Sequence, residues 1–169
     1  MIQVKNAAEL QAMRRACAIS AAALKAGGEA IEAGISTAEI DKIIYDFIVR
    51  HGARPNFLHL YGFPATACIS VNDTVIHGIP SHSQKIRPGD IVSIDTGCKI
   101  DGFNGDNACT FACGKVDKEA QRLMDVTKEA LHRGIAAAQA GNRIGDVGHA
   151  VQSYVEENGF SVVRAFVGH

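Results

Sequence analysis

One sequence pattern occurs twice in this chain, and it constrains the fold more than any other feature. Residues around Ala23 recur around Ala130, a shift of 107 residues. The mostly small residues that repeat are Ala23, Leu24, Gly27, Ala30, Ala33, Gly34 and Gly52, which return as Ala130, Leu131, Gly134, Ala137, Ala140, Gly141 and Gly159. The larger apolar residues that correspond are Ile40, Ile44, Phe47 and Ile48 with Val147, Val151, Tyr154 and Val155. Small residues at fixed places allow two helices to pack closely, so the repeat predicts one helix-pair unit used twice.

Helix start and stop signals fit the first copy of the pattern. Asn6 and Ser36 each begin a capping box, in which a glutamate three residues later bonds back to the cap. The two helices are predicted to end near Gly34 and at Gly52, because glycine readily adopts the left-handed backbone that follows a helix.

After residue 60 the chain alternates between strand and helix periods. The elements expected there are strands over residues 68–71, 74–77, 91–95, 103–111 and 161–167 and helices over 118–138 and 146–159. Turns are expected at residues 88–90 and 101–102, where glycine follows proline or aspartate. The first helical copy is followed by strands and turns over residues 53–114, whereas only residues 160–169 follow the second. We therefore expect the chain to be truncated within its second half.

Two aspartates, Asp95 and Asp106, are the first candidates for a metal site. Each lies on a predicted strand, and one turn joins the two strands. In one register of the turn they face each other with Cβ atoms about 5 Å apart, whereas a turn centred on residues 101–102 makes them diagonal neighbours. Carboxylates so close repel one another, and a shared cation would remove the repulsion. The alternative is that both are solvent-exposed strand residues near a turn.

The residues around the aspartates favour the metal site. Gly97, Gly102 and Gly105 keep side-chain bulk away, and Lys99 is the only basic residue in either strand. An oxygen-rich site of this kind suits Mn, Fe(II), Co or Mg. His77 is a further candidate at the end of a predicted strand, although a lone histidine on a strand is more often structural.

Composition points to an ordinary globular protein. The 17 basic and 18 acidic residues give a net charge of −1 without runs of either sign, so we expect neither nucleic acid nor a membrane as partner. No stretch approaches the roughly 20 apolar residues that a membrane span needs, and we expect a cytoplasmic protein. The five cysteines include no C-x-x-C pair and predict neither a disulfide framework nor a zinc knot.

Several segments carry a resemblance to a known family. They are FPATACISVND at residues 63–73, VIHGIP at 75–80, GDIVSID at 89–95, DGFNGD at 101–106, GFSVVR at 159–164 and the final Gly168-His169. Together they resemble the type I methionine aminopeptidases, over essentially the whole chain. The resemblance implies the pita-bread α/β (α+β) fold, in which paired helices cover an antiparallel sheet in each of two similar halves. It implies a single catalytic domain over residues 1–169, with a first half at 1–115 and a partial second half at 116–169.

The resemblance also implies an active site. Asp95 and Asp106 match the family's first two metal ligands, with Asp106 bridging two divalent ions (Co, Mn, Fe(II) or Zn), and His169 matches the third ligand. His77 matches the histidine that hydrogen-bonds the substrate near the scissile amide. The residues that fall where the methionine pocket is lined are Phe57, Phe63 and Cys68.

The implied activity is the removal of N-terminal methionine from peptides and nascent proteins. The family continues past His169 with a second histidine and two glutamates, one of them the general base, and these have no match here. We therefore expect this chain alone to be inactive and to self-associate through an uncovered sheet. A second departure is Leu60, where many members have a pocket tyrosine, with Tyr61 one place later. The alternatives are an Xaa-Pro aminopeptidase or a non-catalytic pita-bread binding protein.

Overall fold

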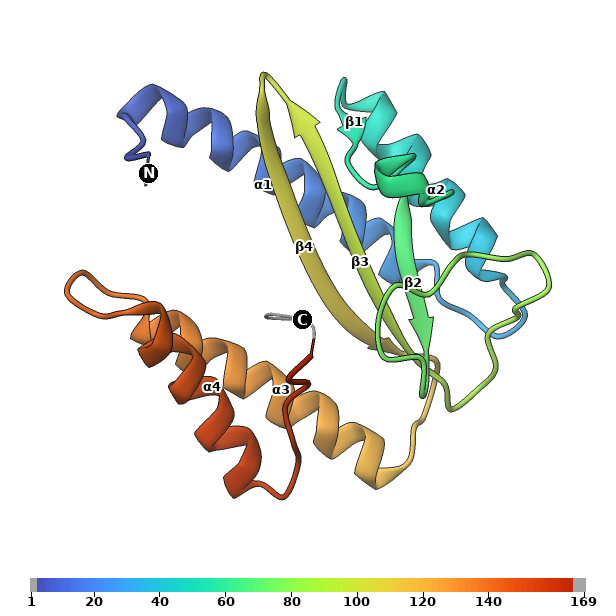
Figure 1. The fold of residues 1–169 in the computed structure, drawn as a ribbon. Helices are drawn as coiled ribbons and strands as arrows, with labels where there is room; N and C mark the ends of the chain where they lie inside the picture. The colour runs from blue at the N-terminus through green and yellow to red at the C-terminus, as the bar shows by residue number, and fades with distance from the viewer. Residues whose placement is uncertain (1–2, 166–169) are drawn as a thin grey trace. The chain divides into compact units, whose positions relative to one another are not determined.

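Nine elements follow one another in the computed structural model, which describes residues 3–165 (Figure 1). In chain order they are α1 (Ala7–Glu29), α2 (Thr37–Arg50), β1 (Arg54–Pro55), the short 3₁₀ helix η1 (Leu60–Gly62), β2 (Ala67–Val71), β3 (Ile91–Ile100), β4 (Phe103–Ala112), α3 (Lys118–Ala137) and α4 (Ile144–Glu157). Contacts divide the chain into two compact units, with the boundary between Val116 and Asp117. The single-domain assignment with halves at residues 1–115 and 116–169 stays a prediction. No helix within residues 3–165 is long and apolar enough to cross a membrane.

Both predicted capping boxes are confirmed at the starts of α1 and α2. The side chain of Asn6 accepts the N–H of Glu9 at 3.0 Å, and the Glu9 carboxylate accepts the N–H of Asn6 at 2.8 Å. Ser36 and Glu39 make the same reciprocal pair. Such a box satisfies two backbone donors that the first helical turn leaves without partners.

Helix α1 ends earlier than the sequence suggested, at Glu29 rather than near Gly34. The reason is a competing set of hydrogen bonds outside the helix. The N–H of Gly34 donates to the carbonyl of Ile86 at 2.8 Å, and the N–H of Ile86 donates to the carbonyl of Ile35 at 2.8 Å. These bonds tie the connection between α1 and α2 to the segment before β3.

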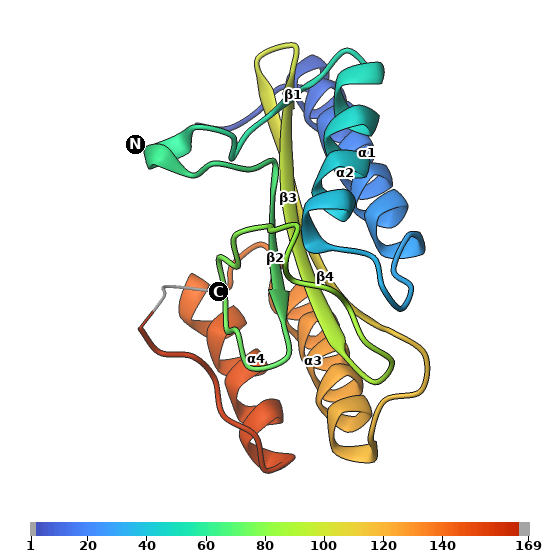
Figure 2. The same ribbon diagram turned by 90° about the vertical axis from the view of Figure 1, so that its right-hand side faces the viewer.

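The first unit contains an antiparallel sheet with β3 at its centre. Strands β1 and β2 pair with β3 along one edge, and β4 pairs with β3 along the other. Helices α1 and α2 lie together on one side of this sheet, as Figure 2 shows. Because side chains alternate between the two faces of a strand, every second residue points towards these helices. The buried core on this side includes Ile69, Val92, Ile94 and Cys98 from the sheet and Ile40, Ile44 and Ile48 from α2.

Helix α1 approaches the sheet so closely that one strand position has room only for glycine. A Cβ atom at Gly105 would lie 2.3 Å from the backbone oxygen of Ala16. On the neighbouring strand, the Cys98 Sγ lies 3.5 Å from the same oxygen. The side chain of Ser20, one turn further along α1, donates a hydrogen bond of 3.0 Å to the carbonyl of Thr96. This row of contacts fixes the helix over β3 and β4.

The second unit repeats the helix packing of the first at the residues that the sequence pattern singled out. A Cβ atom at Gly27 would lie 2.7 Å from the side chain of Ile44, and one at Gly134 would lie 2.8 Å from Val151. These two pairs are related by the same 107-residue shift. Helix α4, like α2, has 14 residues.

The turns after the helices match as well. Gly34 and Gly141 have φ angles of 97° and 95°, and Gly52 and Gly159 have φ angles of 74° and 78°. Most residues with a side chain are strained in this left-handed region, which explains why glycine recurs at both pairs of positions.

Two predicted strands are wrong within the described residues. Residues 74–77 form a loop, because the turn at Asn72 and Asp73 is followed by His77 with a φ angle of 55°, which no strand residue adopts. Residues 161–165 are likewise not a strand, and the rest of that predicted strand lies outside the described residues.

The close approach of α1 predicts that Gly105→Ala destabilises the first unit. Backbone atoms cannot move aside as a flexible side chain can, so we expect a loss of about 1–3 kcal/mol in the free energy of unfolding. Urea denaturation followed by circular dichroism measures this loss. The matched control is Gly148→Ala in α4, where a Cβ would meet no atom within 4 Å. Equal stability of Gly105→Ala and the unsubstituted protein would contradict the close approach.

The capping box of α2 predicts a pH effect. The pKa of Glu39 is lowered from 4.5 to about 2. The largest cause is hydrogen bonding from the side chain and backbone of Ser36, and the hydrogen bond and positive charge of Lys85 add a smaller effect. A carboxylate with a lowered pKa stabilises the folded state above its ordinary pKa, and this contribution is lost as the pH falls from about 4.5 to about 2. We therefore expect Glu39→Gln to flatten the fall in stability over this range, measured by urea denaturation at several pH values. The exposed neighbour Glu32 serves as control, since Glu32→Gln is expected to leave the profile unchanged.

Candidate functional site

The sheet face opposite α1 and α2 carries polar and small side chains. The residues of β2, β3 and β4 on this face include Cys68, Ser70, Ser93, Asp95, Asp106, Ala108 and Thr110. Two cross-strand rows organise them: Ser70 pairs with Ser93 and then Thr110, and Cys68 pairs with Asp95 and then Ala108. In the first row the hydroxyl oxygens of Ser93 and Thr110 lie 2.8 Å apart. The polar row therefore lies directly beside the candidate carboxylate.

Asp95 and Asp106 lie on adjacent antiparallel strands and on the same face. Asp95 is opposite Ala108, and Asp106 is opposite Gly97. The two aspartates are thus diagonal neighbours, for which the Cα separation is roughly 7–8 Å. Of the two registers that the sequence left open, the structure has the one set by a turn at residues 101–102. Asp95 is half-buried and Asp106 is exposed.

Gly97 lies between the aspartates on this face and leaves room for two side chains. A Cβ atom at Gly97 would lie 3.1 Å from Asn56 Nδ2 and 3.2 Å from the ring of Phe57. The N–H of Asn56 also donates to the carbonyl of Gly97 at 2.9 Å. Phe57, which the resemblance assigned to the methionine pocket, therefore packs over the sheet next to the position opposite Asp106.

Cys68 adds a neutral sulfur to the same face. Burial, followed by the negative charges of Asp95, Asp106 and Asp41, raises the pKa of the Cys68 thiol to about 12. The thiol is therefore protonated at neutral pH. In this state Cys68 is a small, polarisable, uncharged group on the sheet face.

The loop that carries His77 docks against the free side of β2. The carbonyl of Gly78 accepts the N–H of Ile69 at 2.8 Å, and the N–H of Gly78 donates to Ser70 Oγ at 3.1 Å. A Cβ atom at Gly78 would lie 2.1 Å from the carbonyl oxygen of Ile69, so only glycine allows this contact. His77 itself is exposed and is held next to the strand that carries Cys68.

The segment between β1 and β2 carries the remaining pocket residue. Phe63 is half-buried and caps η1, donating its N–H to the carbonyl of Leu60 at 2.9 Å. Leu60 and Tyr61, the two candidates for the pocket wall, are 49% and 100% exposed. Neither Leu60 nor Tyr61 packs into the core of the unit. The half-buried aromatic side chains of this segment are those of Phe57 and Phe63.

Sequence reasoning missed one residue at this site, Asp41 of α2. Its Oδ1 atom accepts the N–H groups of Thr66 and Ala67 at 2.9 and 2.7 Å, just where β2 begins. Burial raises the pKa of Asp41, although the two hydrogen bonds oppose this shift. The signal was present in the sequence: Asp41 shares a helical face with Ile44 and Ile48, and a carboxylate on an apolar face needs a specific partner.

The donor atoms fit a metal ion in part. Asp95 and Asp106 offer carboxylate oxygens, which hard divalent ions prefer. Within residues 3–165, however, no group of three or more His, Cys, Asp or Glu could hold a metal ion. The predicted third ligand, His169, lies outside the described residues. Among residues 3–165 this face therefore offers two carboxylates that could hold a metal ion.

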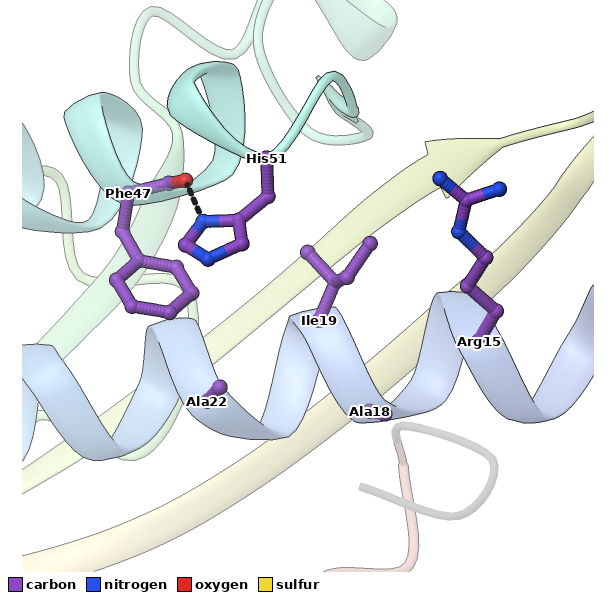
Figure 3. A pocket seen from close by; sticks show the side chains of 6 residues that line it. All are labelled: Arg15, Ala18, Ile19, Ala22, Phe47 and His51. Carbon is purple, nitrogen blue, oxygen red and sulfur yellow. Dashed lines mark hydrogen bonds between the residues drawn. The ribbon is translucent and has the colours of Figure 1, made fainter.

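A hollow of about 320 Å³ lies on the other side of the first unit (Figure 3). Its lining residues are Arg15, Ala18, Ile19, Ala22, Phe47 and His51, all from α1 or from the end of α2. The ring of His51 stacks on Phe47 with centroids 4.2 Å apart, and Arg15 is paired with Asp101 at 2.7 Å. None of the predicted site residues that the structure describes borders this hollow, so the polar sheet face is the better candidate site.

Comparison with known proteins assigns the family. The sequence profile of metallopeptidase family M24 matches residues 11–169. The chain belongs to this family. The methionine aminopeptidase of Clostridium perfringens is 48% identical over all 169 residues, which cover 68% of that protein, and methionine aminopeptidase 1 of Bacillus subtilis is 43% identical with the same coverage. A member of a metallopeptidase family uses a divalent metal ion, which agrees with the carboxylate pair.

Solved structures of M24 proteins share the fold. The methionine aminopeptidase of Thermotoga maritima superposes with a TM-score of 0.96 at 34% identity, covering the whole of this chain and 68% of that one. An aminopeptidase P from Escherichia coli reaches a TM-score of 0.80 at 25% identity and is covered to 34%. The predicted pita-bread fold is confirmed. The higher identity to methionine aminopeptidases disfavours the Xaa-Pro alternative.

The docking of the His77 loop predicts that Gly78→Ala releases it from β2. We expect amide exchange at Ile69 to accelerate, because the substituted loop can no longer accept its hydrogen bond at the same distance. Hydrogen exchange resolved by NMR measures the effect. Gly145→Ala is the control: a Cβ there would meet no atom within 4 Å, and the backbone of Gly145 is not left-handed. Unchanged exchange at Ile69 in Gly78→Ala would refute the docking.

Proposed function

We propose that this chain carries the substrate-binding and first metal-binding residues of a methionine aminopeptidase, which removes N-terminal methionine from peptides and nascent proteins. The observation that supports this function most directly is the placement of Asp95 and Asp106 on one sheet face, beside Phe57 and Cys68. The names of relatives that are 43–48% identical agree with it. A non-catalytic binding protein would not need two neighbouring carboxylates on one face of the sheet.

The residues that would hold two divalent ions, chosen from Co, Mn, Fe(II) and Zn, are Asp95, Asp106 and His169. When bound, such ions acidify a water molecule and polarise the scissile carbonyl. The contribution of the chain is to hold two carboxylates at a fixed diagonal offset, because both strands belong to one hydrogen-bonded sheet. A site on strands keeps its ligands in place better than a site on loops.

The remaining roles follow from the positions of the side chains. His77, on a loop anchored through Gly78, would donate a hydrogen bond to the substrate near the scissile amide and stabilise the charge or the leaving nitrogen that develops there. Phe57, Phe63 and Cys68 would line the pocket for the methionine side chain. A protonated thiol and aromatic rings suit a thioether, since sulfur makes favourable contacts with aromatic edges. The cytoplasmic location and self-association stay predictions.

The incomplete ligand set predicts that a polypeptide of these 169 residues has little aminopeptidase activity and binds metal weakly. Two carboxylates and one imidazole give neither the ligand number nor the general base that amide hydrolysis requires. Hydrolysis of a methionyl peptide with added Mn²⁺ or Co²⁺ measures the activity, and light scattering on the same sample reports self-association. Turnover by a monomer of this length at the rate of an intact enzyme would refute the prediction.

The ligand assignment is tested by substitution. Asp95→Asn and Asp106→Asn should each weaken Mn²⁺ binding on the order of tenfold or more, because an amide cannot replace a carboxylate charge. Electron paramagnetic resonance of free Mn²⁺ detects weak binding over the millimolar range. Asp73→Asn removes an exposed carboxylate in the turn after β2 and should leave binding unchanged. Equal loss in all three variants would mean that binding reflects net charge alone.

A further inference from the structure

We propose that Asp41 is a positioning residue of this site: its carboxylate holds the pocket segment, defined as residues 57–66, and the start of β2 in register with Asp95. The inference rests on the function proposed above. It concerns a residue that does not touch the carboxylate pair and that acts through the backbone of its neighbours.

The contacts of Asp41 lie at the point where the pocket segment joins the sheet. One oxygen, Oδ1, accepts two hydrogen bonds, from the N–H of Thr66 at 2.9 Å and from the N–H of Ala67 at 2.7 Å. Thr66 is 1% exposed and Ala67 is 0% exposed, so water cannot replace the carboxylate as acceptor. Two buried donors that lose their acceptor are costly, and the backbone would have to move to satisfy them.

The pocket segment has few other attachments. Among the described residues, the backbone hydrogen bonds of the pocket segment before Thr66 all join two residues of the segment itself. In one of them the N–H of His59 donates to the carbonyl of Phe63, and three more join residues in and next to η1. At its start the segment is tied to β3 by the N–H of Asn56, which donates to Gly97 at 2.9 Å. Asp41 therefore provides the tie at the other end. Phe57 and Phe63 lie between these two ties.

The register of Cys68 depends on the same tie. Ala67 is the first residue of β2 and pairs with Thr96, so Cys68, the next residue, comes to lie opposite Asp95. Asp41 is close enough for its charge to contribute to the raised pKa of the Cys68 thiol. A carboxylate on α2 thus links the helix layer to the pocket wall, across the edge of the sheet at which β2 begins.

The experiment compares Asp41→Ala, which removes the acceptor, with Asp41→Asn, which keeps an oxygen at the same position. In Asp41→Ala we expect amide exchange at Thr66 and Ala67 and alkylation of Cys68 by iodoacetamide to accelerate on the order of tenfold, because local opening exposes them. Asp41→Asn should restore both rates. Exchange is read by NMR, and labelling by mass spectrometry of the peptide that contains Cys68. Asp46→Ala is the matched control, since Asp46 lies on the same helix and pairs only with Lys42 among the described residues.

Mn²⁺ binding separates positioning from general stability. The two proposed ligands lie on β3 and β4, so Asp41→Ala should leave Mn²⁺ affinity within about twofold of the unsubstituted chain while the pocket segment loosens. Unchanged exchange and labelling would overturn the proposal. A parallel loss of Mn²⁺ affinity, or failure of Asp41→Asn to restore the rates, would overturn it as well.

If circular dichroism shows that Asp41→Ala does not fold, Asp41→Glu replaces it, because the longer side chain keeps an acceptor but displaces it. Faster exchange at Thr66 and Ala67 and faster labelling of Cys68 in Asp41→Glu then support the proposal, and unchanged rates overturn it. Failure of the proposed function shows itself elsewhere, as an absence of any Mn²⁺ effect in Asp95→Asn and Asp106→Asn. Exchange at Thr66 and labelling of Cys68 test the positioning by Asp41 without reference to metal.

Discussion

The contact between α1 and the sheet at Gly105 is the constraint on which the first unit depends. A backbone oxygen of Ala16 lies where a side chain at position 105 would be, so helix and strands approach as closely as backbones can. Ser20 and Cys98 add contacts along the same line. Because α1 and α2 take one face of the sheet for the apolar core, the residues on the other face need not be apolar, and this is where the carboxylates lie.

The site is built from this division of faces and from two anchored segments. Strands β3 and β4 fix Asp95 and Asp106 relative to each other through ladder hydrogen bonds. The pocket segment and the His77 loop are not strands, and each is held by a small number of specific contacts. Gly78 holds the His77 loop against β2. Asp41 and Gly97 hold the two ends of the pocket segment. The sheet thus holds the two carboxylates in fixed positions, and the loops carry the side chains proposed to contact a substrate.

The two helix pairs of this chain use the same packing contact between their helices. In both units a glycine on the first helix accepts a branched apolar side chain from the second, Ile44 at Gly27 and Val151 at Gly134. A side chain larger than hydrogen at either glycine would push the helices apart. The close packing of each helix pair requires a residue without a Cβ at one position. The glycines therefore predict the packing of the helices better than the larger residues around them do.

The sequence by itself determined the helices, their caps, the central strands and the two aspartates, because capping boxes, periodicity and glycine spacing act over a few residues. The sequence left open the register of β3 and β4. It also predicted a strand over residues 74–77, because the residue pattern there resembles that of a strand although the segment forms a loop. Only the tertiary structure decided these points: the turn at residues 101–102 made the aspartates diagonal, and the docking of Gly78 on β2 held His77 in a left-handed conformation. The partners of Asp41 also required the fold: its place on an apolar helix face indicates that it needs a partner, but Thr66 and Ala67 lie 25 and 26 residues away.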